Sequence, residues 1–355
     1  MEKSPPFQED RLLPKKLTVI MSLVALLSFS SVLGQSESDE LYPIVQDGRE
    51  GYIDKYGRII VDPQFDHAYF FSEGLGLFGT ALKTDVDGQV VKIPQLRGYI
   101  DNTGKIIVPP RFKTACLFSE GLACAGIEKG VGFINKTGRF IIEPRFRQAK
   151  DFSEGLAPVQ IDEKWGYINK DGQMVIEPQF DDANSFSDGL GRVEMNGNYV
   201  YISRSGAVVI RISAIDAGDF HEGLAQVVMG NDSEKTKSGY IDKSGRMVIR
   251  PLFDDACDFH EGLACVEIAG KMGYIDKTGR VAIALQFDIA EDFSEGLAKV
   301  VDWQYGFIDK QGKIVIEPQF VWAGQFSGGL AQVMVEDKKK GYIDRAGNYV
   351  WRPSK

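Results

Sequence analysis

The sequence has little of what most enzyme active sites are built from. Histidine occurs only three times in 355 residues, at His67, His221 and His260. His221 and His260 take the place of a serine in a recurrent turn, so neither belongs to a separate catalytic set. The chain contains no Gly-x-Ser-x-Gly nucleophile elbow and no glycine-rich phosphate loop before a helix. We therefore expect a protein that is not an enzyme, with no catalytic residues and no cofactor.

Carboxylates are plentiful, but their pattern does not indicate acid–base chemistry or a metal site. A general acid and a general base need two carboxylates in different environments. The segment Thr84–Gly88 resembles a calcium loop but lacks its distal glutamate, so we predict a turn there and no bound metal. The recurrent glutamates share one turn environment and are expected to be solvated or to accept backbone N–H groups: Glu73, Glu120, Glu154, Glu222, Glu261 and Glu295.

Clusters of basic residues are also missing. The chain carries 41 lysines and arginines against 50 aspartates and glutamates, a net charge of −9. No stretch gathers lysine or arginine. Because an acidic surface repels phosphate backbones, we expect no nucleic-acid partner.

Only one long apolar run occurs, from Leu17 to Leu33, and two lysines precede it. This arrangement is typical of a signal peptide, which we predict over residues 1–34 with cleavage before Gln35. The alternative is an uncleaved N-terminal anchor, which would be the chain's sole contact with a membrane. The first cysteine is Cys116, which excludes a lipid-modified N-terminal cysteine. We therefore expect an exported protein, periplasmic or secreted.

The most informative pattern is a tandem repeat of about 34 residues. Gly-Tyr-Ile-Asp or a close variant recurs along the whole chain, with longer intervals of 47 and 39 residues in two places. A repeat of this kind predicts an architecture of stacked equivalent units. The nine units, within residues 41–355, start near Gly51, Gly98, Gly132, Gly166, Val200, Gly239, Gly273, Gly306 and Gly341.

Each unit reads as a set of short strands joined by tight turns. In Asp276–Gly279, as in most copies, Asp or Asn opens a turn that glycine closes, which is typical of a hairpin. The flanking segments Gly273–Ile275 and Arg280–Ile283 are expected to pair as antiparallel strands. In eight units Phe-Ser-Glu-Gly-Leu or a near copy follows, and its Leu begins a third strand. The sequence therefore predicts an all-β fold with three or four strands in each unit.

These motifs resemble those of a known family, the WG-repeat proteins of bacteria. The segment Lys164–Gly172, with Trp165, Gly166, Tyr167 and Ile168, is similar to the family's signature. Only Trp165 occupies the tryptophan position, because the other eight units carry other residues there. The resemblance implies a β-repeat protein, often exported, without a common assigned activity.

The repeat is compatible with two architectures. We expect an open or curved array of stacked β-hairpin units from about Leu41 to Lys355. The alternative is a closed β-propeller, in which the lone opening strand Leu41–Val45 would complete the last blade. The unit is shorter than the forty or more residues of an ordinary four-stranded blade, which favours the open array.

All four cysteines lie in two equivalent settings. Each pair brackets the Phe-x-Glu-Gly-Leu turn at a separation of eight residues, and another unit places Glu291 and Lys299 in the same two positions. Complementary charges at these positions indicate facing residues. We therefore predict the disulfides Cys116–Cys124 and Cys257–Cys265. Free buried thiols and one zinc site are the alternatives, although the usual zinc spacing is missing.

The insertions indicate where a partner would bind. Both lengthened units carry their extra residues between the Leu strand and the Gly-Tyr-Ile strand, so the inserted residues emerge on one face. Tolerated surface loops would look the same. We predict a non-enzymatic scaffold for protein–protein interaction, and alternatively a module that binds glycan or cell-wall peptidoglycan. The aromatic residues expected near these loops are Trp165, Tyr199, Trp303 and Tyr305.

Overall fold

The computed structural model describes residues 40–80, 83–86, 89–92, 95–230, 236–336 and 338–352. The side chains of residues 81–94 are not described. The described part of the chain consists of β-strands and turns, as the repeat pattern predicts. It contains no helix long and apolar enough to cross a bilayer. The signal peptide predicted over residues 1–34 lies outside the described residues.

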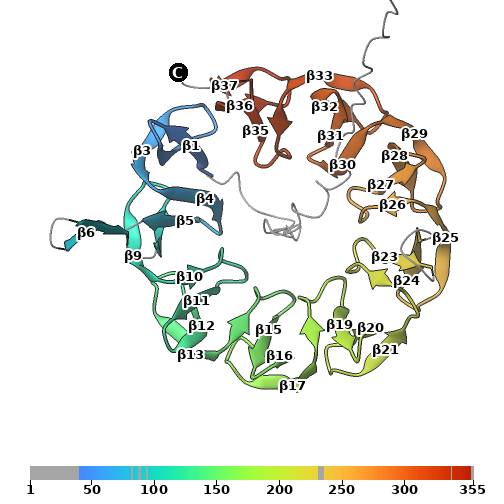
Figure 1. Ribbon diagram of the computed structural model, residues 1–355, viewed down its shortest axis with the longest axis horizontal. Helices are drawn as coiled ribbons and strands as arrows, with labels where there is room; N and C mark the ends of the chain where they lie inside the picture. Colours follow the sequence, from blue (N-terminus) through green and yellow to red (C-terminus); the bar gives the residue numbers. More distant parts are fainter. Residues whose placement is uncertain are drawn as a thin grey trace, which may run out of the picture. The chain divides into compact units, whose positions relative to one another are not determined.

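The unit Asp39–Lys355 is a closed β-propeller (Figure 1). Its described residues form nine consecutive sheets, one with three strands and eight with four. The expected open array is therefore wrong, and the propeller given as the alternative is what the chain forms. We label the strands of a blade A to D from the central channel outward. Strands D lie on the outer rim of the ring.

The blades follow one another in chain order. Blade 1 lacks strand A and consists of β1 (Tyr42–Gln46), β2 (Arg49–Ile53) and β3 (Ile59–Phe65). Blades 2 to 5 are β4 (His67–Ser72), β5 (Leu75–Thr80), β8 (Leu96–Asp101) and β9 (Ile106–Phe112); β10 (Thr114–Ala115), β11 (Ala123–Ile127), β12 (Gly130–Ile134) and β13 (Phe140–Phe146); β14 (Gln148–Ala149), β15 (Leu156–Ile161), β16 (Lys164–Asn169) and β17 (Met174–Phe180); and β18 (Asp182–Ala183), β19 (Gly191–Met195), β20 (Asn198–Ile202) and β21 (Val208–Arg211).

Blades 6 to 9 repeat this order. They are β22 (Asp216–Ala217), β23 (Leu224–Met229), β24 (Lys237–Asp242) and β25 (Met247–Phe253); β26 (Asp255–Ala256), β27 (Leu263–Ile268), β28 (Lys271–Asp276) and β29 (Val281–Phe287); β30 (Ile289–Ser294), β31 (Leu297–Asp302), β32 (Gln304–Asp309) and β33 (Ile314–Phe320); and β34 (Trp322–Ala323), β35 (Leu330–Met334), β36 (Lys340–Asp344) and β37 (Tyr349–Trp351). The first insertion forms a separate hairpin of β6 (Lys83–Val86) and β7 (Gln89–Lys92).

The sequence repeat and the blade are out of phase. A unit that begins at Gly-Tyr-Ile-Asp supplies strands C and D of one blade and strands A and B of the next. Strand A is only two residues long in six of the eight blades that have one. This brevity explains why about 34 residues suffice for a four-stranded blade. Since each full unit spans two blades, consecutive blades are linked by a shared repeat, except at the seam between blades 9 and 1.

The turn between strands C and D is built as the sequence predicts. In blade 7 the Asp276 Oδ1 atom accepts hydrogen bonds from the backbone N–H groups of Thr278 (2.8 Å) and Arg280 (3.1 Å). Gly279 closes the turn at φ +80°, a conformation that costs a residue with a Cβ atom about 1–2 kcal/mol. The same side-chain cap recurs around the ring, with Asp in most blades and Asn in two, so these half-buried residues have a structural role.

The core lies between neighbouring blades. The tyrosine of Gly-Tyr-Ile is fully buried, as at Tyr167, where its ring packs against Phe186 of the next blade at 5.1 Å between centroids. Its hydroxyl donates to the Asn184 carbonyl oxygen at 2.7 Å. Burying a phenol requires such a partner for its O–H group. The tyrosine therefore joins strand C of one blade to strand A of the next.

The ring closes by packing blade 1 against blade 9. The Tyr342 hydroxyl donates to the Pro43 carbonyl oxygen (2.8 Å), and the Tyr42 hydroxyl donates to the Gly328 carbonyl oxygen (2.6 Å). Tyr42, Ile44 and Ile53 share a buried cluster with Leu330 and Tyr342. The expectation that the first strand would complete the last blade is wrong in detail, since β1 pairs with β2 in its own sheet. Blade 9 already has four strands.

Candidate functional site

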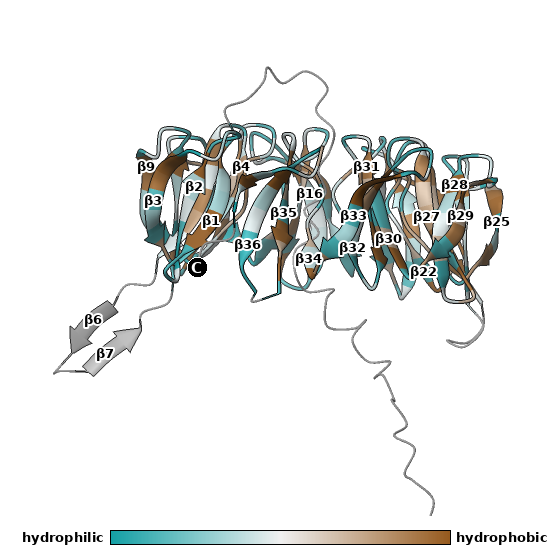
Figure 2. Ribbon diagram, turned by 90° about the horizontal axis from the view of Figure 1, so that it is seen from above, coloured by the Kyte–Doolittle hydropathy of each residue, from teal (hydrophilic) through white to brown (hydrophobic). Residues whose placement is uncertain are grey.

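The two faces of the ring are built differently. Neighbouring strands in a blade are antiparallel, so the A–B and C–D turns lie at one face and the B–C loops and D–A connections at the other (Figure 2). We call the first the tied face and the second the loop face.

The tied face is a network of contacts between blades. In the A–B turn, the Glu120 carboxylate accepts a hydrogen bond from the Gly155 backbone N–H of the next blade at 3.0 Å. It also pairs with Lys170 at 3.0 Å, and the Ser119 hydroxyl donates to the Phe152 carbonyl oxygen at 2.7 Å. The interpretation of the turn glutamates as acceptors of backbone N–H groups is confirmed. Equivalent carboxylate–glycine bonds join Glu73 to Gly121, Glu154 to Gly189, Asp188 to Gly223, Glu222 to Gly262, Glu261 to Gly296 and Glu295 to Gly329.

The loop face carries the irregular parts of the repeat. The hairpin β6–β7 lies between β5 and β8 of blade 2, and the second insertion joins β23 to β24 of blade 6. Both are B–C connections. All length variation therefore falls on one face, as the spacing of the motifs indicates.

Trp303 is the most exposed large apolar side chain among the described residues. It is 92% exposed and forms a one-residue connection between Asp302 and Gln304, the paired ends of β31 and β32. Its φ of +67° is unfavourable for a bulky residue. Neither burial nor backbone geometry favours tryptophan here. An exposed and strained aromatic residue at a loop tip is typical of a binding residue.

The other three predicted aromatic residues do not project from this face as Trp303 does. Trp165 is only 6% exposed and packs in the core beneath the Lys150 ammonium, 5.1 Å from its ring centroid. Tyr199 and Tyr305 are half-buried. The structure therefore separates the predicted set instead of bringing it together. Trp165 faces inward because strand C alternates: Trp165 pairs with Phe180, whose side chain also points into the core.

A collar of apolar side chains on the loop face was missed by sequence reasoning. These residues lie five positions after the Leu of the A–B turn, where strand B ends. Ile161 and Ile268 are 36% and 40% exposed, and Asp302 replaces the apolar residue in blade 8, just before Trp303. Aligning the repeats in this column would have revealed the collar. Its half-buried members are Ile127, Met195, Met229 and Val335.

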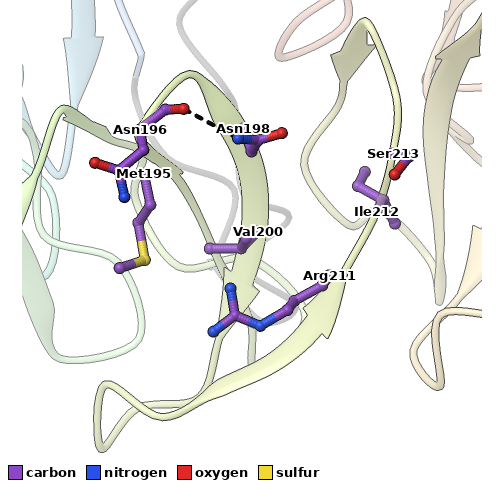
Figure 3. Close-up of a pocket in the computed structure, with 7 residues that line it drawn as sticks. All are labelled: Met195, Asn196, Asn198, Val200, Arg211, Ile212 and Ser213. Carbon is purple, nitrogen blue, oxygen red and sulfur yellow. Dashed lines mark hydrogen bonds between the residues drawn. The ribbon is translucent and has the colours of Figure 1, made fainter.

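Two shallow cavities open beside this collar. One of about 280 Å³ lies in blade 5 between the B–C loop and the end of β21, where Met195 and Arg211 line it (Figure 3). The other, of about 670 Å³, lies between blades 3 and 4 and combines Ile161 with Arg145 and Arg147. The first is lined by both polar and apolar residues with one charged side chain, Arg211, whereas charged residues make up most of the lining of the second.

Both predicted disulfides are present, and the described residues include no free cysteine. The charge pair that indicated the facing positions is also formed, with Lys299 Nζ 2.8 Å from Glu291 Oε2. Neither free thiols nor a zinc site is needed to account for the four cysteines. Each bond links strand A to strand B of its blade, and the sulfur atoms face the next blade.

Removing a disulfide is expected to destabilise the ring moderately. C116S/C124S opens a loop of eight residues, for which the chain-entropy relation gives about 2–3 kcal/mol. Urea unfolding of the variant and the wild type, both without reductant, measures the difference. An unchanged midpoint would contradict the stabilising role.

Two histidines lie in consecutive blades beside half-buried carboxyls. His221 Nε2 is 3.5 Å from Asp258 Oδ2, and His260 Nε2 is 3.5 Å from Asp292 Oδ2. Burial lowers the pKa of His260 and raises the pKa of Asp292 to about 7. His67 is distant and exposed, 3.8 Å from Glu50. The repeat places each of the first two pairs across a blade boundary.

Comparison with known families identifies the repeat. The model described as WG containing repeat matches residues 51–78, 98–129, 132–165, 165–199, 239–271, 272–302 and 305–338. The chain belongs to the WG-repeat family. The unit that starts at Val200, with β21, β22 and β23, and the last unit from Gly341 lie outside these matches, yet both regions complete blades. No curated protein matches the chain.

Solved structures match this chain only at low similarity. BamB from Moraxella catarrhalis is 9% identical with a TM-score of 0.39, over 67% of this chain and 77% of that one. Hsv2p from Kluyveromyces lactis is 8% identical with a TM-score of 0.37, over 56% of this chain and 74% of that one. An extracellular domain of a putative hybrid two-component system from B. thetaiotaomicron is 11% identical with a TM-score of 0.27, over 88% and 64%. These values carry no argument about function.

Proposed function

We propose that this protein is an exported, non-enzymatic scaffold whose loop face docks a protein partner, with Trp303 as the central contact. The observation that carries the proposal is the exposed, strained position of Trp303. Trp is enriched among residues that dominate binding energy at interfaces. The two disulfides support an exported location, because such bonds persist in oxidising compartments.

The contrast between the faces favours the loop face over the tied face. On the tied face, recurrent carboxylates and hydroxyls bind the next blade's backbone and are not free for a partner. The loop face combines the collar, both cavities and both insertions. Exposed apolar side chains gathered on one face are expected at a site of association.

Trp303→Gly is expected to weaken partner binding strongly without destabilising the ring. Glycine removes the positive-φ penalty, so the free energy of unfolding should stay equal or rise by about 1 kcal/mol. The dissociation constant for the partner should rise at least about 30-fold, as for an interface hot spot of 2 kcal/mol or more. Urea unfolding and a binding titration measure the two effects.

Tyr56→Ser provides the matched control. Tyr56 is 68% exposed but lies in a C–D turn of the tied face. The control should bind the partner as the wild type does. Equal loss of binding in both variants would contradict the assignment of the loop face.

The partner is sought by crosslinking in an envelope fraction with the tagged full-length chain as bait. Thr80 and Leu96 are directly paired, so residues 81–95 can be replaced by a two-residue loop like the one that joins Ile161 to Lys164 in blade 4. A protein captured by the wild type and lost with this variant or with Trp303→Gly supports the scaffold. Capture unaffected by both changes would refute it.

Glycan or cell-wall binding is the second candidate, favoured by the same exposed indole ring. A flat aromatic face can stack on a sugar ring. Retention of the wild type on cell-wall material, lost in Trp303→Gly and without any crosslinked protein, would support this candidate instead.

A further inference from the structure

Each disulfide faces a carboxyl group of the next blade. In blade 7, Cys257 and Cys265 lie opposite Asp292 of blade 8, and one potential donor atom from each of the three lies within 4.8 Å of the others. The Cys265 Sγ atom is 3.8 Å from Asp292 Oδ1. The same arrangement recurs four blades earlier with Cys116, Cys124 and Asp151.

Folding does not account for these carboxyls. The same column holds Leu117, Ser185 and Gln325 in other blades, so the propeller does not require a carboxyl there. Where the column carries Asp219, the facing residue is Arg192, whose Nε atom lies 3.0 Å from the carboxylate. A carboxyl buried against sulfur lacks that compensation and costs free energy.

A fourth donor is present at the blade 7 cluster. His260 Nε2 is 3.5 Å from Asp292 Oδ2, and its ring stacks on that of His221 at 5.3 Å between centroids. The column that His260 occupies holds Ser119 at the blade 3 cluster. The two clusters therefore share two sulfurs and a carboxyl and differ in the imidazole.

We propose that, once its disulfide is reduced, the cluster Cys257, Cys265, Asp292 and His260 binds a divalent transition metal of the zinc type. Two thiolates, one carboxylate and one imidazole are donors that Zn²⁺ takes in tetrahedral sites. The donors come from two adjacent blades, and two of the four side chains, Cys257 and Cys265, pack in a buried cluster. His260 acts either as the fourth ligand or as the donor that orients the Asp292 carboxylate.

Reduction of the disulfide and binding of the metal require one reagent besides the metal, a dithiol. A dithiol donates two electrons and two protons to break the Cys257–Cys265 bond and becomes a disulfide itself. Metal binding then releases the two thiol protons to solvent, together with the carboxyl proton where Asp292 carries one. Oxidation reverses the sequence and expels the metal. In the reduced protein the metal thus links blade 7 to blade 8, whereas in the oxidised protein the disulfide links two segments within blade 7.

Cobalt titration of the full-length protein tests the site, because thiolate–Co²⁺ coordination gives a charge-transfer absorption band. In the C116S/C124S background, the reduced protein should bind one Co²⁺ with this band, and Zn²⁺ should displace it. The oxidised protein should show no band. H260S and D292N should each weaken Co²⁺ binding about 10–100-fold, with circular dichroism confirming that both variants fold.

The blade 3 cluster is the built-in control. In the C257S/C265S background the reduced pair Cys116 and Cys124 has no imidazole beside it, and Co²⁺ affinity should be at least about 10-fold lower. Adding S119H should recover part of that difference. The proposal is overturned if the reduced C116S/C124S protein gives no thiolate band, or if D292N and H260S leave the affinity unchanged.

Discussion

Replacing Gly57 by alanine is expected to lower the free energy of unfolding by about 3 kcal/mol, because it disrupts the seam of the ring. Gly57 adopts φ +80° in the C–D turn of blade 1, and a Cβ atom there would overlap the backbone carbonyl oxygen of Val350 in blade 9. At the other blade boundaries the equivalent glycine meets a valine or isoleucine side chain, as Gly172 meets Ile142 at 3.1 Å. A side chain can move aside, whereas a backbone carbonyl in a strand cannot do so cheaply.

Gly74→Ala separates the seam contact from the conformational penalty. Gly74 has φ +83°, but a Cβ atom at this position meets nothing within 4 Å. It should therefore cost only the positive-φ term, about 1–2 kcal/mol. Urea unfolding measures both variants, and solution scattering shows whether Gly57→Ala opens the ring. Equal losses in the two variants would mean that blades 1 and 9 do not meet in solution as they do here.

Ring closure could not be predicted from the repeat itself. The local motifs predict the strands, the turns and their order, since Asp276 and Gly279 act within one turn. Closure depends on the rotation from one blade to the next, which is set by packing between blades. The short repeat unit favoured the open array, which is wrong, because strand A needs only two residues, as in Thr114–Ala115. The seam contact between Tyr342 and Pro43 joins residues 299 positions apart and leaves no local signal.

The position of an individual side chain could be predicted only where another repeat unit carried informative residues in the same columns. The cysteines were placed correctly because Glu291 and Lys299 occupy the same columns in another blade and their charges reveal the contact. Trp165 lies beside a loop as predicted, but its side chain is buried, and a single aromatic residue in the sequence gives no information about the direction of its side chain. Its burial follows from pairing with Phe180 across strands C and D. Trp303 was predicted as a binding residue because it lies near the loops in the sequence. Its strained backbone conformation is visible only in three dimensions.

The repeated contacts between blades lie on one face, which explains how loops on the other face can vary in length without unfolding the ring. The Ser119 and Glu120 contacts, repeated around the tied face, hold adjacent blades through backbone groups and require little of the loops opposite. Insertions such as β6–β7 therefore leave the ladder between β5 and β8 intact. The contacts that tie adjacent blades therefore lie on the tied face and place little constraint on the loop face, where we propose that a partner binds.

The stability of the oxidised protein is expected to fall as the pH rises through about 6, because of Asp151. Burial raises the pKa of this carboxyl from 3.8 to about 6, and its Oδ1 atom has no hydrogen-bond partner among the described residues. Between pH 4 and pH 6 the folded protein keeps a proton that the unfolded chain has lost. The stabilisation is therefore complete below pH 4 and disappears above pH 6. The shift corresponds to about 3 kcal/mol.

Asp151→Asn removes this contribution, since an amide does not titrate. The difference in unfolding free energy between the variant and the wild type should grow by about 3 kcal/mol from pH 4 to pH 8 in favour of the variant. Taking the difference cancels the other groups, including Asp292, whose raised pKa acts in the same direction, and His260, whose lowered pKa acts in the opposite one. Asp171→Asn, at an exposed turn, controls for the loss of one negative charge. A pH-independent difference for Asp151→Asn would show that water reaches this carboxyl beside the disulfide.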